Sequence, residues 1–226
     1  MIPAPFYMER YNQTSHFFIN QQRCLHDQPH AHPTRGARRL PAGRIRRPHG
    51  VVVTEEVFDS LDGYVTIFHE FVHCYQFETC EPALKSQLAI AQKAQAENNH
   101  LWEINMPFPY GNEGFIDAYT RLEQALAQRD LPAVIETRTI LHDLLAPMEY
   151  EYMLWQEWKE GFARWLENRM QSALNLSLNH RGGHEPFTRV SFYARGAGLV
   201  ALLAENDPAL VNDLERLFHQ LDGLGQ

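Results

Sequence analysis

The pattern of apolar and polar positions predicts helices over most of the chain after residue 54. Asn112 and Asp130 stand where helix N-caps are expected, and prolines mark first turns or interruptions. The segment Tyr64–Phe77 is apolar and aromatic enough to be expected as a largely buried helix. The other helices are expected at Glu55–Leu61, Glu81–Asn98, Glu113–Gln128, Leu131–Leu145, Glu149–Leu174, Thr188–Ala204 and Pro208–Leu221.

The N-terminal part of the chain has a different pattern. Val51–Thr54 is β-branched throughout and follows a Pro-His-Gly turn, so it is the best strand candidate, with His16–Ile19 as a second. Between them, Gln28–Gly50 is rich in proline, glycine, histidine and arginine and cannot continue a helix. The sequence therefore predicts an α+β fold, mainly α, with a small N-terminal β element.

Length and composition indicate one folded domain. The chain has 226 residues, of which 44% are hydrophobic, and this suffices for a proper core. We expect residues 1–62 to form the irregular and β-containing part and residues 63–226 to form the helical part. The longest aliphatic run, Val51–Val53, is too short to cross a bilayer, and no signal peptide is visible. We therefore expect a cytoplasmic protein that does not associate with membranes.

Charge and cysteine content exclude several functional classes. A net charge of −8 argues against general affinity for nucleic acid or anionic membranes. Residues 23–47 hold seven arginines and one acid, Asp27, but their prolines and glycines favour a solvated loop over a nucleic-acid surface. The cysteines, Cys24, Cys74 and Cys80, lack C-x-x-C spacing, so neither a disulfide framework nor a cysteine-rich metal site is expected.

The pentapeptide His-Glu-Phe-Val-His at residues 69–73 is the chemically most informative stretch. On a helix, residues four apart lie on the same face, so His69 and His73 can converge on one ion. Glu70 is placed to reach a water molecule held by that ion. This is the H-E-x-x-H arrangement of zinc hydrolases, in which the glutamate acts as general base.

A catalytic zinc site needs a third protein ligand. The metzincin pattern would require a glycine and a histidine at the positions that Gln76 and Thr79 occupy, so this pattern is excluded. The remaining option is a glutamate from a later helix.

The segment Glu160–Glu167 has the sequence Glu-Gly-Phe-Ala-Arg-Trp-Leu-Glu. It resembles the E-G-F-A-x-Y-x-E segment of gluzincin metallopeptidases, especially thermolysin-clan aminopeptidases. Together with H-E-x-x-H, this resemblance implies a zincin-like fold with Glu160 as the third zinc ligand. Glu113 begins a second Glu-Gly-Phe sequence and is the alternative ligand, although the preceding Asn112 also suits a plain helix N-cap.

The chain departs from that family at several positions. Arg164 replaces the acid that orients a zinc histidine in thermolysin-type enzymes, and we expect Glu167, on the same helix face as Glu160, to take that role. Gly161 and Ala163 are expected to allow close approach to the histidine-bearing helix. The aminopeptidase G-x-M-x-N motif is absent, so removal of N-terminal residues is not expected.

The sequence thus predicts a zinc-dependent hydrolase, and first of all a peptidase that cleaves an amide bond of a peptide or protein. Zn²⁺ lowers the pKa of a bound water from about 15.7 to about 7, and Glu70 would take up the proton and pass it to the leaving amine. Tyr193 is the first candidate donor to the oxyanion, and His184 is the second. Tyr150 and Tyr152 are further candidates that we expect to be core aromatics.

Several alternatives stay open at this level. The sequence does not separate a peptidase from another amide hydrolase, or endo- from exo-cleavage, and it leaves the oligomeric state undetermined. A different function is a catalytically inactive or regulatory zincin-like binding module; Glu70 argues against it, because metal binding alone needs no base there. A substrate peptide is expected to add to the edge of the β element at Val51–Thr54.

Overall fold

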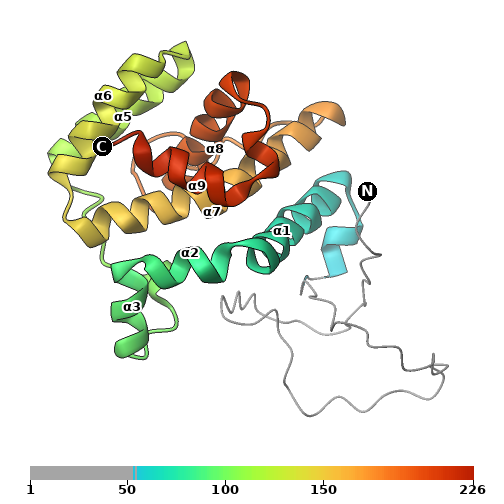
Figure 1. The fold of residues 1–226 in the computed structure, drawn as a ribbon. Coiled ribbons are helices and arrows are strands. Elements are labelled where there is room, and N and C mark those ends of the chain that lie inside the picture. The colour runs from blue at the N-terminus through green and yellow to red at the C-terminus, as the bar shows by residue number, and fades with distance from the viewer. Residues whose placement is uncertain (1–52, 54) are drawn as a thin grey trace.

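The computed structural model describes residue 53 and residues 55–226, and this part of the chain consists of helices joined by loops. Two short 3₁₀ helices, η1 and η2, accompany the α-helices (Figure 1). The elements are η1 (Glu55–Phe58), α1 (Leu61–Thr79), α2 (Glu81–Gln87), α3 (Ala89–Ala96), α4 (Trp102–Asn105), α5 (Glu113–Gln128), α6 (Leu131–Leu144), α7 (Pro147–Ala173), α8 (Arg189–Asn206), η2 (Leu210–Asn212) and α9 (Leu214–Gly223).

The predicted α+β fold is wrong, because residues 55–226 contain no strand and the described fold is all-α. The candidate strand His16–Ile19 lies outside the described residues, as does most of Val51–Thr54. Val53 is described and belongs to no strand. A β-branched run becomes a strand only when another strand pairs with it, and the described chain offers none.

The long helix α7 is the centre of the fold. Figure 1 shows it running between α1 and α2 on one side and α8 and α9 on the other, and it packs most extensively against α8 and α1. Trp155 and Trp158 of this helix are completely buried. Truncation of such a buried aromatic side chain to alanine lowers the free energy of unfolding by on the order of 3–5 kcal/mol. A helix buried on most sides can therefore hold polar side chains in fixed positions.

Two glycines set the distance between α7 and α8. A Cβ atom on Gly161 would lie 2.5 Å from the Cα of Gly196, and one on Gly196 would lie 2.2 Å from the carbonyl oxygen of Glu157. Neither position tolerates a side chain without moving a backbone. Gly161 therefore serves the contact with α8, and the expectation that it serves the contact with the histidine-bearing helix is wrong.

Helix α1 begins at Ser60, whose side-chain oxygen accepts a hydrogen bond from the Gly63 backbone amide at 3.0 Å. Its inward face includes Val72 and Gln76, and the histidines lie beside this face. Two of its aromatic side chains point outward: Phe68 is 50% exposed and Tyr75 is 46% exposed. The expectation of a largely buried helix is thus correct for one side only, because α7 covers α1 from one direction.

Tertiary contacts also move helix boundaries. The helix expected at Glu81–Asn98 is broken at Leu88, where the backbone is extended (φ −78°, ψ 128°). The Glu151 carboxylate of α7 accepts hydrogen bonds from the backbone amides of Ala89 (3.2 Å) and Ile90 (2.9 Å), so it caps α3 from another helix. Within residues 55–226, no helix has the length and apolar character needed to cross a bilayer.

Candidate metal centre

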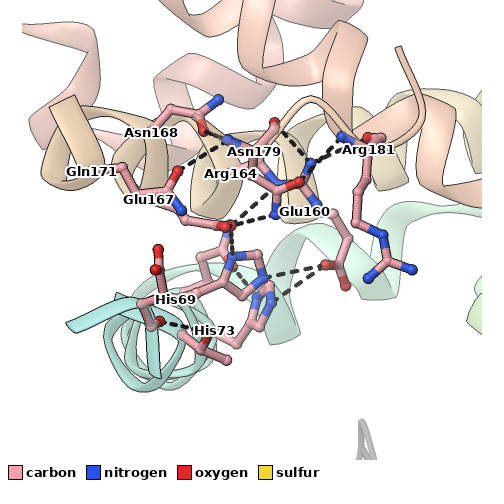
Figure 2. Close-up of polar contacts among 12 residues, drawn as sticks. His69, His73, Glu160, Arg164, Glu167, Asn168, Gln171, Asn179 and Arg181 are labelled. Carbon is pink, nitrogen blue, oxygen red and sulfur yellow. Dashed lines mark hydrogen bonds and ion pairs between the residues drawn. The ribbon is translucent and has the colours of Figure 1, made fainter. Parts of the chain in front are cut away.

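Helices α1 and α7 bring together three side chains that can each offer one ligand atom, and we call His69, His73 and Glu160 the metal group. Figure 2 shows both imidazoles of α1 pointing toward the Glu160 carboxylate of α7. Glu160 Oε2 lies 3.7 Å from His69 Nε2 and 3.5 Å from His73 Nε2. The two histidines and Glu160, which are far apart in the sequence, therefore converge on one point.

The spacing within the metal group is that of ligands around an ion. Hydrogen bonds between such atoms are about 2.7–3.2 Å long, so distances of 3.5 and 3.7 Å are too long for direct bonds. Two atoms that each lie about 2.0–2.2 Å from a tetrahedral ion are about 3.3–3.6 Å apart. Two imidazoles and one carboxylate suit several divalent metals, zinc among them. The residues therefore fit a metal ion.

Glu167 fixes the orientation of His69. Its Oε2 lies 3.0 Å from His69 Nδ1, so in the neutral imidazole this nitrogen carries the hydrogen and Nε2 offers its lone pair toward the metal group. Glu167 also accepts hydrogen bonds from Arg164 Nε (3.1 Å) and Asn179 Nδ2 (2.7 Å). Arg164 in turn donates to the backbone carbonyls of Asn179 and Arg181 (Figure 2). The structure thus brings Glu167 to the side of His69 where a positioning role was expected.

Gln76 performs the same task for His73, and the sequence interpretation missed it. Gln76 Oε1 lies 2.9 Å from His73 Nδ1, and Gln76 Nε2 donates to the carbonyl oxygen of Lys159 at 3.0 Å. The second bond determines which end of the amide faces the imidazole, and the side chain is completely buried. The available signal was an amide three residues after the second histidine, on the same helix face.

Burial and charge act against each other at the metal group. Burial lowers the pKa of His69, but the Glu160 and Glu167 carboxylates outweigh it and raise that pKa to about 9. The pKa of His73 is also raised, since Glu160 overcomes the effect of burial. Burial raises the pKa of Glu160, and the two imidazoles hold it well below its usual range. Binding of a cation must therefore displace protons from the imidazoles.

Glu70 and Tyr193 lie beside the metal group. Glu70 is half-buried and has no hydrogen bond or ion pair within the described chain, so its carboxylate is free to act on another molecule. The ring of Tyr193 lies under the Arg164 guanidinium, 5.8 Å from its centre. Burial and the neighbouring Glu160 carboxylate raise the pKa of Tyr193, which keeps its hydroxyl protonated at neutral pH.

The other candidates have partners elsewhere. Glu113 is exposed at the first turn of α5, where Asn112 caps the helix, and it is not in the metal group. The His184 side chain is 89% exposed and lies 3.8 Å from the Glu123 carboxylate. The hydroxyl of Tyr150 accepts from Arg138, and that of Tyr152 donates to the carbonyl of Glu103. Both tyrosines are buried core aromatics.

Comparisons with protein-family models, with curated proteins and with solved structures find no match to this chain. The resemblance to gluzincins thus rests on two short segments of the sequence, residues 69–73 and 160–167.

Proposed function

We propose that this protein is a zinc-dependent hydrolase that cleaves an amide bond of a peptide or protein substrate. The observation that carries the proposal is the convergence of His69, His73 and Glu160 at distances that suit a shared ion. The resemblance of Glu160–Glu167 to the gluzincin segment supports the same set of ligands. Glu70, half-buried beside both imidazoles, supplies a base that a purely structural metal site does not need.

The chemistry follows from these positions. Zinc, when bound by the three ligands, would supply a Lewis acid that lowers the pKa of water and polarises the substrate carbonyl. Glu70 accepts a proton from the water as its oxygen attacks the carbonyl carbon. Glu70 then passes this proton to the leaving nitrogen, the C–N bond breaks, and a carboxylic acid and an amine are formed. The Tyr193 hydroxyl donates a hydrogen bond to the developing oxyanion.

The cytoplasm is the compartment that we propose for this activity. Among the described residues, Cys80 is a buried thiol outside any disulfide. A reduced thiol suits the reducing conditions of the cytoplasm.

Metal analysis tests the ligand set directly. Wild-type protein purified with limiting zinc is expected to hold one equivalent, Glu160→Ala to lose it, and Glu113→Ala to keep it. Glu113→Ala is a matched control because Glu113 begins the same Glu-Gly-Phe sequence but lies exposed on α5. Zinc retention in both variants would exclude the proposed site.

Hydrolysis of a mixed peptide pool tests the chemistry. The wild type is expected to cleave peptides, and Glu70→Gln is expected to keep its zinc and to lose at least about a hundredfold in kcat, the usual size of a general-base effect. Absence of cleavage by the wild type, with zinc present, would contradict the hydrolase and favour a zinc-containing binding module, whereas equal cleavage by both proteins would exclude Glu70 as the base.

A further inference from the structure

Most arginines of the described chain pair with a carboxylate. The paired ones are Arg121, Arg129, Arg138, Arg164, Arg195 and Arg216. Among residues 55–226, Arg169, Arg181 and Arg189 have no such partner. Two of these three, Arg181 and Arg189, belong to the loop and the helix that follow the metal-group helix α7. Unpaired guanidinium groups beside a candidate active site indicate a negatively charged ligand.

Arg189 is half-buried in the first turn of α8, where it contacts the phenol of Tyr193. It donates a hydrogen bond from Nη1 to the Tyr193 hydroxyl, and its guanidinium lies 5.3 Å from the centre of that ring. A guanidinium has five N–H donors in a planar fork. A single phenol oxygen leaves most of them unused, and no carboxylate among residues 55–226 takes them up. The fork matches a carboxylate, which accepts two parallel hydrogen bonds.

The crossing of α7 and α8 places Arg189 near the metal group. The two helices touch at Gly161 and Gly196, directly after Glu160. Tyr193 lies one turn before Gly196, and its ring is next to Arg164, which lies one turn after Glu160 on α7. Arg189 lies one further turn before Tyr193 and bonds to its hydroxyl, and the Glu160 carboxylate also acts on that hydroxyl, so Tyr193 links Arg189 to the metal group.

Arg181 adds positive charge on the same side. Its backbone carbonyl is held by Arg164 at 3.2 Å, and in Figure 2 its side chain points in the same direction as the Glu160 carboxylate. The Arg181 side chain is exposed. It can therefore attract an anion from solvent but does not hold it in a fixed geometry, which leaves Arg189 as the specific group.

We propose that Arg189 binds a carboxylate of the substrate next to the bond that is cleaved. This inference rests on the proposed function, since it assigns a substrate class to the same site. The carboxylate has two sources: the C-terminal α-carboxylate of a peptide, or the side chain of an aspartate or glutamate within it. The first source makes the enzyme a carboxypeptidase, and the second makes it an endopeptidase that prefers acidic sequences.

Three pools of N-acetylated random hexapeptides distinguish these sources. The first contains only neutral residues and ends in an amide, the second has the same residues with a free carboxylate, and the third contains aspartate and glutamate and ends in an amide. Binding is measured to zinc-loaded full-length Glu70→Gln, which is not expected to consume the peptides. We expect the second or the third pool to bind about tenfold more tightly than the first, as a charge-assisted bidentate pair allows. Equal binding of all three pools, or binding of none, overturns the proposal.

Variants separate recognition of the carboxylate from positioning of Tyr193. In the Glu70→Gln protein, the additional substitution Arg189→Met is expected to abolish the difference in affinity between the pools without changing zinc content or Tm. Arg189→Lys is expected to keep part of this difference. Tyr193→Phe should retain the difference. Arg169→Met is the matched control, because Arg169 also lacks an acidic partner and lies 5.1 Å from an aromatic ring, that of Trp165. A uniform loss of binding for all pools in Arg189→Met would assign Arg189 a positioning role only and overturn the proposal.

Failure of the proposed role of Arg189 can be distinguished from failure of the proposed hydrolase function. A wild type that neither retains zinc nor cleaves peptides would end the hydrolase proposal. A preference for carboxylate pools that depends on Arg189 would still be measurable in that protein, whereas a working zinc hydrolase without this preference would remove only the role of Arg189.

Discussion

Lys159 and Glu160 are neighbours in the chain and are both almost completely buried, yet the structure satisfies their charges in opposite ways. Lys159 Nζ bonds directly to Glu81 (2.8 Å) and Glu103 (3.1 Å). Glu160 instead faces two imidazoles at distances too long for hydrogen bonds. The group around Lys159 is therefore closed by direct bonds between opposite charges, although Glu81 Oε2 takes no hydrogen bond, and the group around Glu160 has the spacing of ligands around an ion.

The closed group consists of Lys85, Lys159, Glu81 and Glu103, and we call it the lysine cluster. Burial raises the pKa of Glu103, but Lys159 and Lys85 overcome it and lower that pKa. A buried ion pair of this kind adds little net stability, although loss of one partner is costly. Gln76 connects the two groups, since it contacts His73 with one end and the Lys159 carbonyl with the other. Burial of charge alone does not identify a functional site; side chains arranged as ligands around one point do.

Removal of the lysine charge is expected to have the largest effect. Lys159→Met leaves Glu81 and Glu103 buried with less positive charge, which should lower the free energy of unfolding by about 3–5 kcal/mol. The loss should be the same with and without zinc, because the lysine cluster does not bind it. Urea unfolding measures both. Lys93→Met, at an exposed position of α3, is the control and should stay within about 0.5 kcal/mol of wild type.

Chelation should affect the metal group alone. At free zinc of about 100 times Kd, bound zinc adds about 2.7 kcal/mol to the stability of the wild type, and this contribution disappears when a chelator is added. Glu160→Gln should show no response to the chelator, whereas Glu113→Ala should respond like wild type. The comparison between the two groups would fail if Glu160→Gln and the wild type lost equal stability on chelation.

In the zinc-free protein, the change of stability with pH should come from the imidazoles of the metal group. The pKa of His69 is raised from 6.5 to about 9, so its contribution is fully present below pH 6.5 and is lost as pH rises through 9. Stability in the presence of a chelator should therefore fall by on the order of 2 kcal/mol between these values. Zinc should reverse the trend, because ligand imidazoles must be neutral.

Unfolding curves at pH 6, 7.5 and 9, with chelator or with zinc, check both signs. His69→Asn should show a weaker fall with chelator. An increase of stability with pH in the chelated wild type would contradict the raised pKa of His69.

Loss of either positioning residue should have the smallest effect. Glu167→Gln and Gln76→Leu are each expected to weaken zinc affinity about 10–100-fold, because the supported histidine is no longer held in the correct tautomer and orientation. Competition with a coloured chelator measures the affinity. Gln87→Leu, an exposed glutamine on α2, should leave it unchanged. Unchanged affinity in Gln76→Leu would show that the Lys159 carbonyl does not help to orient His73.

Local sequence patterns predicted most of the helices and two members of the metal group, His69 and His73. Asn112 and Asp130 mark helix starts that the structure confirms, since each accepts a hydrogen bond from the backbone three residues later. His69 and His73 had to share a helix face because their spacing is four. Glu160 was named from its resemblance to a family segment, and the geometry of the metal group agrees with that choice over Glu113. The predicted β element was wrong because strand formation depends on a partner that local propensity does not supply.

By itself, the sequence determined the spacing that lets two imidazoles meet, the positions of many helix caps, and the absence of a nearby third histidine. Only the tertiary structure decided which side of α1 faces inward, because that depends on where α7 lies. It also decided that Gln76 and Glu167 hold the two histidines, and that Arg189 is left without an acid. These features arise from contacts between residues up to 98 positions apart, as between His69 and Glu167. A local pattern of apolar and polar residues does not specify contacts between residues so far apart in the sequence.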